Sequence, residues 1–392
     1  MKPSRVLVLD ADQRSALAIT RSLGKLDGVT VFTSDATPTA LAGSSRYSRA
    51  YSQLPDPVSE PRKFLVALEK LVETFEIGFL LPVTEVSCRL LLENSDRFSQ
   101  CILPFPDHET VLAVSDKNHL TKVALEKGIP VPATRYFNKL EEWDYSTESH
   151  FPVVIKPALS KQYDGSCWIS TAVRVANNRD ELECVVKEEP YLANSAFMVQ
   201  EFIPGHGEGV FVLFDQGRPR CCFSHQRLRE KPPSGGVSVL SQAKSVDATL
   251  QRYTEVLLEH FQWTGVAMVE FRVTEDNKAY LMEINTRFWG SLQLGIDAGV
   301  NFPAELYYLY TGSPSSHSTS YDTETRLRWY LGDLDSLYLF LRDSNRTMSE
   351  KLKRIAGFLA FHRHTRHEIF RGDDWSPALH ELRSYLRALF GV

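Results

Sequence analysis

The sequence predicts an α/β protein with a doubly wound N-terminal domain, a two-lobed α+β middle region and a helical C-terminal tail. Three observations predict this architecture. Near the start, the apolar runs VLVL and VTVF enclose the helix-like stretch SALAITRSL, and IGFLLPV adds another buried strand. In the middle, strand-like runs such as VVIK and GVFVLF prevail. At the end, ALHELRSYLRALF has the apolar spacing and mixed charge of an amphipathic helix.

The first domain, residues 1–115, has the strand, helix, strand order of a Rossmann-like unit. The turn after its first strand reads DADQRS and lacks the three glycines of a dinucleotide fingerprint, which excludes an NAD or FAD site there. Thr84 and Glu85 follow the strand at IGFLLPV, at the sheet edge where α/β proteins present ligands. They are candidate substrate contacts, and a helix cap is an equally good interpretation.

Three further segments follow. A capped helix beginning at SDK opens residues 116–190, which form a small compact unit. Residues 191–312 contain longer strand-like runs and form a larger unit. Residues 313–392 begin in a Ser/Thr-rich stretch typical of a linker and continue as the helical tail.

Composition narrows the class of protein. The chain has 392 residues, enough for two or three domains, and its 43% hydrophobic and 24% charged residues are those of an ordinary soluble protein. A net charge of −5 gives no support to a nucleic-acid-binding surface. No apolar run reaches the length of a membrane span, and the N-terminus lacks a signal-peptide pattern. We therefore expect a cytoplasmic protein without nucleic-acid or membrane partners.

The cysteines and a histidine tract carry weaker signals. The six cysteines show no CxxC spacing, and a cytosolic chain keeps them reduced, so we expect thiols in the core or at strand edges, with Cys167 as the one to watch. FHRHTRHE places His362, His364 and His367 together. Its interleaved arginines favour a solvated basic segment over a metal site.

A predicted hairpin at 266–291 carries the strongest chemical signal. If Asp276-Asn277 forms its turn, Glu270 lies opposite Glu283, and the period of two puts Asn285 on the same face. Two facing carboxylates repel one another unless a cation lies between them, and an all-oxygen set suits Mg²⁺ or Mn²⁺. The alternative is a solvent-facing hairpin in which Lys278 and Arg272 pair with the acids.

Two other segments suit a nucleotide. Lys156 ends an apolar strand beside the loop ALSKQYDGSCW, where its ammonium could bind a phosphate, although a plain surface lysine is the commoner outcome. In MVQEFIPGHGEG, a Gln-Glu pair precedes apolar residues and a turn, and exposed backbone groups there could read a nucleobase. Glu208 could then bind ribose hydroxyls. A strand followed by a turn explains the same pattern without any ligand.

In this order, SDK, VVIKP with its loop, QEFIPG, AMVEF and MEINTRFWGS resemble the ATP-grasp superfamily over residues 1–312. The likeness is greatest to the single-unit carboxylate-amine ligases related to the carbamoyl-phosphate synthase large subunit. The resemblance implies an ATP-grasp fold after a pre-ATP-grasp domain, with ATP and Mg²⁺ (or Mn²⁺) as cofactors. It also implies small-molecule carboxylate and amine substrates, with a homodimer as the candidate assembly.

Carried across by position, the resemblance assigns roles to individual residues. Phosphate binding falls to Lys117 and Lys156, adenine binding to Gln200, Glu201 and Ile203, ribose binding to Glu208, and metal binding to Glu270, Glu283 and Asn285. Arg287 is a candidate to stabilise the transferred phosphoryl group, and Arg227, in the basic Gly-Gly segment, to contact the acceptor substrate.

The chain departs from the family in one place. The loop after Lys156 is usually glycine-rich, but here it has only Gly165, so Lys161 and Ser166 are candidates to replace backbone contacts with side-chain contacts.

The expected reaction is ATP-dependent ligation through an acyl-phosphate. A kinase, a carboxylase that uses bicarbonate, and a degenerate nucleotide-binding protein remain as alternatives. Trp289 is either a wall of the acceptor pocket or a core residue.

Overall fold

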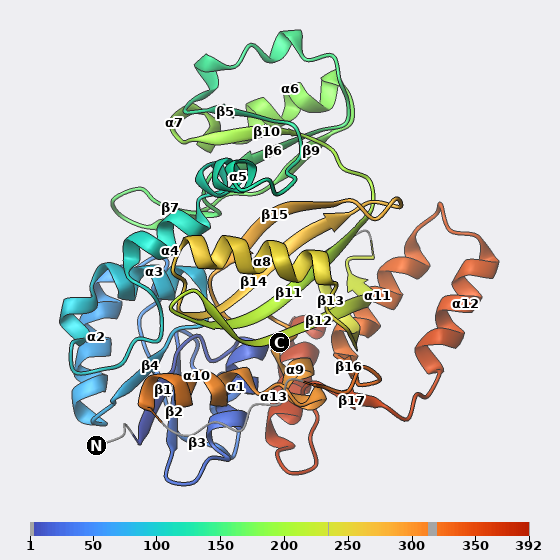
Figure 1. The fold of residues 1–392 in the computed structure, drawn as a ribbon. Coiled ribbons are helices and arrows are strands. Elements are labelled where there is room, and N and C mark those ends of the chain that lie inside the picture. Colours follow the sequence, from blue (N-terminus) through green and yellow to red (C-terminus); the bar gives the residue numbers. More distant parts are fainter. Residues whose placement is uncertain (1–3, 234, 313–319, 392) are drawn as a thin grey trace.

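The computed structural model describes residues 4–233, 235–312 and 320–391. Its N-terminal domain is a parallel sheet in the order β3-β2-β1-β4 (Figure 1). The alternating residues of β1 separate its two faces: Val6 and Val8 pack with α1, whereas Leu7 and Leu9 pack with α2 and α3. This confirms the predicted doubly wound start. The elements are β1 (Arg5–Val8), α1 (Arg14–Leu23), β2 (Thr30–Asp35), β3 (Ser48–Gln53), α2 (Pro61–Thr74), β4 (Phe79–Leu81), α3 (Glu85–Glu93) and α4 (His108–Ser115).

The small lobe is a separate antiparallel sheet in the order β5-β10-β6-β9, and stands above the rest of the molecule in Figure 1. The boundary predicted from the sequence, at 190/191, assigns residues 197–201 to the large lobe. In the structure these residues form β10, which pairs with β5 and β6 of the small lobe. A short hairpin, β7-β8, leaves this lobe after β6. The elements are α5 (Lys117–Glu126), β5 (Thr134–Phe137), β6 (Val153–Pro157), β7 (Lys161–Tyr163), β8 (Trp168–Ser170), β9 (Arg174–Ala176), α6 (Arg179–Glu188), α7 (Tyr191–Asn194) and β10 (Phe197–Glu201).

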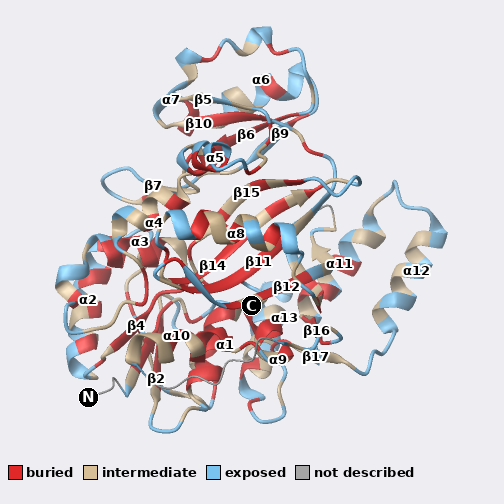
Figure 2. Cartoon of the chain, in the orientation of Figure 1, coloured by how far each residue is buried: buried red, intermediate tan, exposed pale blue. Residues whose placement is uncertain are grey.

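The large lobe is built on a seven-stranded sheet in the order β15-β14-β11-β12-β13-β16-β17. One face packs under α8 through residues such as Val210 and Phe271, and the other packs on the N-terminal domain through Phe211 and Phe223. Both faces are therefore buried over much of the sheet (Figure 2). The elements are β11 (His206–Asp215), β12 (Arg218–Lys231), β13 (Val237–Lys244), α8 (Ala248–His260), β14 (Gly265–Val273), β15 (Ala279–Asn285), α9 (Leu292–Ala298) and α10 (Phe302–Thr311).

The C-terminal region is more than a helical tail. It contributes β16 and β17 to the far edge of the large sheet, where they pair in parallel. Its second helix, α12, has no buried residue and projects from the molecule (Figures 1 and 2). None of the described helices is long and apolar enough to cross a membrane. The elements are β16 (Arg326–Arg328), α11 (Tyr330–Arg342), α12 (Met348–Leu359), β17 (Thr365–His367) and α13 (Ser376–Phe390).

Candidate active site

The hairpin of β14 and β15 places Glu270 directly opposite Glu283, as the sequence predicts. The turn itself differs from the prediction. Thr274–Lys278 form a longer loop in which Asn277 takes a left-handed conformation (φ 60°), so Val273 pairs with Ala279. A bulge at the Glu270/Phe271 step then leaves Met282 unpaired and restores the predicted register. The longer loop shifts the strand pairing by one residue, and the bulge shifts it back, so Glu270 and Glu283 are paired as predicted.

The two facing carboxylates are held in different electrostatic surroundings. Burial raises the pKa of Glu270, and the neighbouring charge of Glu283 adds to this, while Arg227 opposes it. Burial also acts to raise the pKa of Glu283, but Lys117, Lys156 and a hydrogen bond from Asn285 Nδ2 outweigh it, so the net pKa is lowered. The neighbouring lysines therefore favour the ionised form of Glu283.

Two buried lysines approach these acids from the small-lobe side. Lys117 opens α5 after the Asp116 cap, and its Nζ lies 3.4 Å from Glu283 Oε2 and donates to Ser160 Oγ at 2.9 Å. Lys156, on β6, has only the Met282 sulfur, 3.6 Å from its Nζ, as a hydrogen-bond partner among the described residues. Burial lowers the pKa of Lys156 to about 8. Lys156 is thus a desolvated ammonium without an anionic partner in contact.

Two arginines lie on the other sides of the pair. Arg227 is two residues beyond His225, which is paired with Gly209, itself the partner of Glu270. Gly207, two residues before Gly209 on β11, has no side chain beside Glu270 Oε1, and Arg227 Nη2 comes within 3.3 Å of that oxygen. Arg287 contacts Asn285 Oδ1 at 3.5 Å and the carbonyl of Phe288 at 3.0 Å. It makes no ion pair with any described carboxylate, so its charge is free to bind an anion.

The predicted adenine-binding segment connects the two lobes. Gln200 is buried on β10, on the same face as Lys156, which pairs with Met198. Its Nε2 donates to Thr134 Oγ1 at 2.8 Å, while its Oε1 has no hydrogen-bond partner within the described ranges. Glu201 is exposed, and the carbonyl of Ile203 accepts from Arg272 Nε at 3.2 Å. The unused Gln200 oxygen is an acceptor suited to a base amino group.

Glu208 is not brought together with the metal candidates. It pairs with Phe271, one position along from Glu270, so its side chain starts from the opposite face of the sheet. Its oxygens accept from Lys244 Nζ at 2.7 Å and contact His206 Nε2 at 2.9 Å. Glu208 still borders a cavity of about 540 Å³ that Arg227 and Glu270 also line. Ribose binding by Glu208 stays a prediction, and it would require an exchange of these partners.

The family described as "ATP-grasp in the biosynthetic pathway with Ter operon" matches residues 193–331. No curated protein sequence matches the chain. Among solved structures, the L-amino acid ligase of Bacillus licheniformis superposes with a TM-score of 0.59 at 16% identity, covering 80% of this chain and 74% of that one. The chain has the ATP-grasp fold.

Two other structures support the same conclusion. The ADP complex of N5-carboxyaminoimidazole synthetase from Staphylococcus aureus has a TM-score of 0.60 at 14% identity, covering 83% of this chain and 82% of that one. Biotin carboxylase from Campylobacter jejuni has a TM-score of 0.63 at 14% identity, covering 83% and 74%. These superpositions confirm the ATP-grasp fold that the resemblance implied.

The loop after Lys156, which the resemblance predicts to cover phosphates, forms a hairpin that packs on the N-terminal domain. It forms β7-β8, and Trp168 from this hairpin is buried in the core of the N-terminal domain, with its backbone N–H donating to the carbonyl of Val58. Arg89 reinforces the contact through the carbonyl of Lys161 (2.6 Å) and the Trp168 ring (4.8 Å). Lys161 and Ser166, the proposed substitutes for backbone contacts, bond within the hairpin, to Ser170 and Asp164.

Polar residues also gather around the carboxyl end of β1. Thr84 caps α3 by accepting from Ser87 N, so the cap interpretation is confirmed. Asp10, which the sequence reading did not single out, accepts from the Val83 and Thr84 amides and from Ser87 Oγ. Its position directly after the VLVL strand was the available signal. Trp289 is 3% exposed and packs against Phe211 and Phe302, which confirms the core interpretation.

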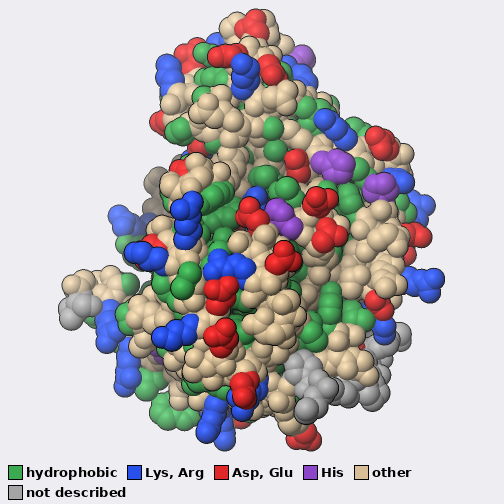
Figure 3. Space-filling view, turned by 90° about the vertical axis from the view of Figure 1, so that its left-hand side faces the viewer, with side chains coloured by type: hydrophobic (Ala, Val, Ile, Leu, Met, Phe, Trp, Pro, Cys, Tyr) green, Lys and Arg blue, Asp and Glu red, His purple; other side chains and the backbone are tan. Residues whose placement is uncertain are grey.

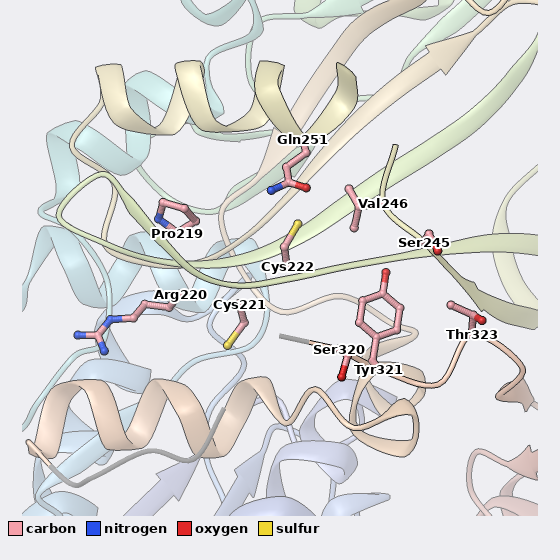
Figure 4. A pocket seen from close by; sticks show the side chains of 10 residues that line it. All are labelled: Pro219, Arg220, Cys221, Cys222, Ser245, Val246, Gln251, Ser320, Tyr321 and Thr323. Atoms are coloured by element: carbon pink, nitrogen blue, oxygen red, sulfur yellow. The ribbon is translucent and has the colours of Figure 1, made fainter. Parts of the chain in front are cut away.

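The expectation of core or strand-edge thiols holds only in part, because Cys88 and Cys221 are buried whereas Cys184 is exposed on α6. Cys221 and Cys222 project to opposite sides of β12 beside a separate cavity of about 470 Å³ (Figure 4). Burial raises the pKa of each to about 12, so neither is a reactive thiolate. Cys167, at the exposed end of β7-β8, lies 3.6 Å from Asp164 Oδ2.

In Figure 3, acidic, basic and apolar side chains are interspersed over one face of the molecule.

Proposed function

We propose that this ATP-grasp protein joins a small-molecule carboxylate to an amine through an acyl-phosphate, converting ATP to ADP and phosphate. The observation that carries the proposal is the pair Glu270 and Glu283, opposed on one hairpin and ringed by cationic side chains. The cations come from both lobes: Lys117 and Lys156 from the small lobe, Arg227 and Arg287 from the large lobe. Such a site suits a polyanionic substrate that brings its own metal.

The residues at the pair fit a hard divalent cation. Glu270, Glu283 and the Asn285 oxygen form an all-oxygen set of the kind Mg²⁺ shares with substrate phosphates. No group of three or more His, Cys, Asp or Glu side chains is arranged for metal binding in the described part of the chain, so substrate and water oxygens would complete the coordination. A bound Mg²⁺ would neutralise triphosphate charge and polarise the phosphoryl oxygens.

The chain's own residues supply binding and orientation. Lys117 and Lys156 are placed to hold the β- and γ-phosphates, and the Gln200 oxygen and Ile203 backbone to hold adenine. The unpaired guanidinium of Arg287 suits the charge that develops on the transferred phosphoryl group. Arg227, at the mouth of the 540 Å³ cavity, suits the acceptor carboxylate or the acyl-phosphate. Glu208 is retained as the ribose candidate.

The reaction proceeds by two displacements. A substrate carboxylate oxygen attacks the γ-phosphorus, and the bond from phosphorus to the ADP oxygen breaks. The amine nitrogen then attacks the acyl carbon, phosphate leaves with one carboxylate oxygen, and the amine proton passes to solvent. The carboxylate is already ionised at neutral pH, so the first step needs no general base, whereas a hydroxyl acceptor would need one. This favours ligation over the kinase alternative.

The test is a product assay on purified protein with a panel of acids and amines. The ligase predicts stoichiometric ADP and inorganic phosphate only when both substrates are present, and a hydroxamate when hydroxylamine replaces the amine. Oxygen-18 placed in the carboxylate must appear in the released phosphate. A stable phosphorylated product would instead establish a kinase, and nucleotide binding without turnover against the full panel would establish a degenerate site.

Bicarbonate belongs in the acid panel. It is a carboxylate by chemistry, and the similar solved structures include carboxylases and an N5-carboxyaminoimidazole synthetase. Turnover with bicarbonate plus an amine, and with no other acid, would assign the protein to N-carboxylation by the same mechanism.

A further inference from the structure

A second cluster of cationic side chains lies at the opposite edge of the large sheet. The register of four strands places Arg229, Leu240, Arg328 and His367 in one row across β12, β13, β16 and β17. Arg326 is two residues before Arg328 on the same strand and shares its face. These residues lie on the face opposite Leu327, which packs in the core shared with the N-terminal domain. The strand register therefore concentrates three arginines and a histidine on one side of the sheet.

This row is the floor of a cavity of about 240 Å³, which we name the arginine pocket. Its walls are apolar and come from the end of α12 and the segment after it, including Phe358, Leu359 and Phe361, together with Tyr330 of α11. Phe361 is 90% exposed, so the pocket has an apolar rim open to solvent. The floor is cationic and the walls are apolar, a combination that suits a small molecule with an anionic and an apolar part.

The cations around the arginine pocket outnumber their carboxylate partners. Asp333, which is fully buried, pairs with Arg229 at 2.5 Å, Arg328 at 2.7 Å and Arg354 at 3.3 Å. No second described carboxylate lies within ion-pair distance of these three arginines or of Arg326. The pKa of Arg229 is lowered, first by burial and also by the charges of Arg354 and Arg328. The cluster thus carries surplus positive charge that an anion would compensate.

Hydrogen-bond donors also remain unused. Arg326 bonds through Nε to Gln242 Oε1, and its two terminal nitrogens have no partner among the described residues. Arg229 Nε and His367 Nδ1 are likewise without a partner there. Arg229 and Arg328 each give one donor to a carbonyl at the end of α12, of Gly357 and Phe358 respectively. Arg326 is therefore the residue best placed to bind a ligand oxygen with both terminal nitrogens.

We infer that the arginine pocket binds a small organic anion, a carboxylate or phosphate ester carrying a flat or branched apolar group. The anionic group would contact Arg326 and Arg328, and the apolar group would lie against Phe358 and Phe361. The site is distinct from the nucleotide site, because Arg229 and Arg227 belong to opposite faces of β12: the register shifts between them, pairing Arg227 with Ser241 and Arg229 with Leu240. It also gives a role to the FHRHTRHE segment, which forms part of the pocket.

The test is calorimetric titration of the full chain with four probes: phenyl phosphate, benzoate, inorganic phosphate and phenol. We expect saturable binding of phenyl phosphate or benzoate with Kd of about 1 mM or tighter, weaker binding of inorganic phosphate, and none of phenol. Whether phenyl phosphate or benzoate binds more tightly identifies the anionic group. Absence of saturable binding of both would overturn the inference.

Three variants locate the binding. Arg326→Gln should weaken it by at least about tenfold, whereas Arg366→Gln, which removes the same charge from the other face of β17, should leave it unchanged. Phe361→Ser, at an exposed position, should weaken phenyl phosphate binding more than inorganic phosphate binding. Binding that survives Arg326→Gln but is lost in Lys156→Gln would place the anion in the nucleotide site and refute the arginine pocket, whatever the outcome for ligase activity.

Discussion

Glu270 and Glu283 face one another, yet their side chains have different partners. Glu283 pairs with Lys117 of the small lobe and feels the charge of Lys156, whereas Glu270 pairs with Arg227 of the large lobe. Movement of the small lobe therefore changes the surroundings of one carboxylate more than those of the other. Each acid is predicted to be required for turnover, and because both are proposed ligands of one cation, their substitutions should not act independently.

Replacing Glu283 by Gln removes its charge without changing its volume. We expect kcat to fall by at least about 100-fold while the melting temperature stays near that of the wild type. Glu270→Gln should act in the same direction, and the double variant should be little worse than either single one. Glu275→Gln, an exposed loop position of the same hairpin, is the matched control. Wild-type kcat for Glu283→Gln in saturating Mg²⁺ would contradict the metal assignment.

Lys156 makes nucleotide binding depend on pH. Its pKa of about 8 means that the ammonium is lost above that pH in the free protein, so affinity for ADP should fall as the pH rises from 7 to about 9.5. Lys156→Arg keeps a permanent charge and should flatten the profile. Calorimetric titration with MgADP across this range measures the effect. Parallel profiles for the two proteins would remove Lys156 from the phosphate site.

The same shift has a consequence for stability. The folded-state pKa of Lys156 lies below its ordinary value of 10.5, so the buried ammonium opposes folding at neutral pH. That cost is fully present below pH 8 and disappears as the pH rises through the interval up to 10.5. The lysine is therefore retained at the expense of stability, as expected for a residue that serves a ligand.

At the scale of elements, the strand pattern made much of the site predictable. The alternation in 266–273 and 279–285 was sufficient to pair Glu270 with Glu283, because residues of one face must repeat every second position. The bulge at Met282 was not predictable, since nothing in LMEIN distinguishes a bulged methionine from a paired one. Nor was the partner of β10 predictable, because an apolar strand pattern does not specify which sheet it joins.

The β7-β8 hairpin is the element that departs most from expectation. The sequence showed a glycine-poor loop, but not that Trp168 inserts between helices of another domain, because that contact spans about a hundred residues of chain. As a consequence, the loop beside the predicted phosphate site is tied to the N-terminal domain. Its freedom to cover a nucleotide depends on releasing this contact.

Trp168→Ser should free the hairpin without unfolding the lobes. The lost burial and the lost Arg89 contact should make the Lys161–Tyr163 segment accessible, and trypsin cleavage after Lys161 should accelerate by about tenfold or more. Trp375→Ser is the control, because Trp375 is 58% exposed. If both variants are cleaved at the wild-type rate, the hairpin is not held by Trp168.

At the scale of the whole molecule, the C-terminal region packs against the N-terminal domain. The sequence predicted a separate helical tail beyond residue 312, because periodicity identifies helices but not what they pack against. In the structure, this region extends the large sheet and its loop after β17 meets α1. Arg21 of α1 donates to Asp374 and to the carbonyls of Glu368 and Ile369, all on buried surface. The junction connects the first domain to the last segment.

Two adjacent aspartates at this junction each form an ion pair, one of them buried and the other exposed. Asp374 is 2% exposed, and its carboxylate accepts from Arg21 Nε at 2.8 Å, from Ser45 Oγ at 2.7 Å and from the Arg46 amide at 2.9 Å. Asp373, the preceding residue, pairs with Lys25 at 2.8 Å where both side chains are about half exposed. Breaking a buried pair strands an uncompensated charge, whereas an exposed pair contributes little.

We therefore expect Asp374→Ala to lower the free energy of unfolding by about 3–5 kcal/mol, and Asp373→Ala to lower it by less than about 1 kcal/mol. The measurement is urea denaturation followed separately by tryptophan fluorescence and by circular dichroism, since a chain with several domains can unfold in steps. The loss in Asp374→Ala should appear in the transition that exposes α1, because Arg21 is left buried without its partner. Equal effects of the two substitutions would mean that the C-terminal region only rests on the N-terminal domain and does not stabilise it.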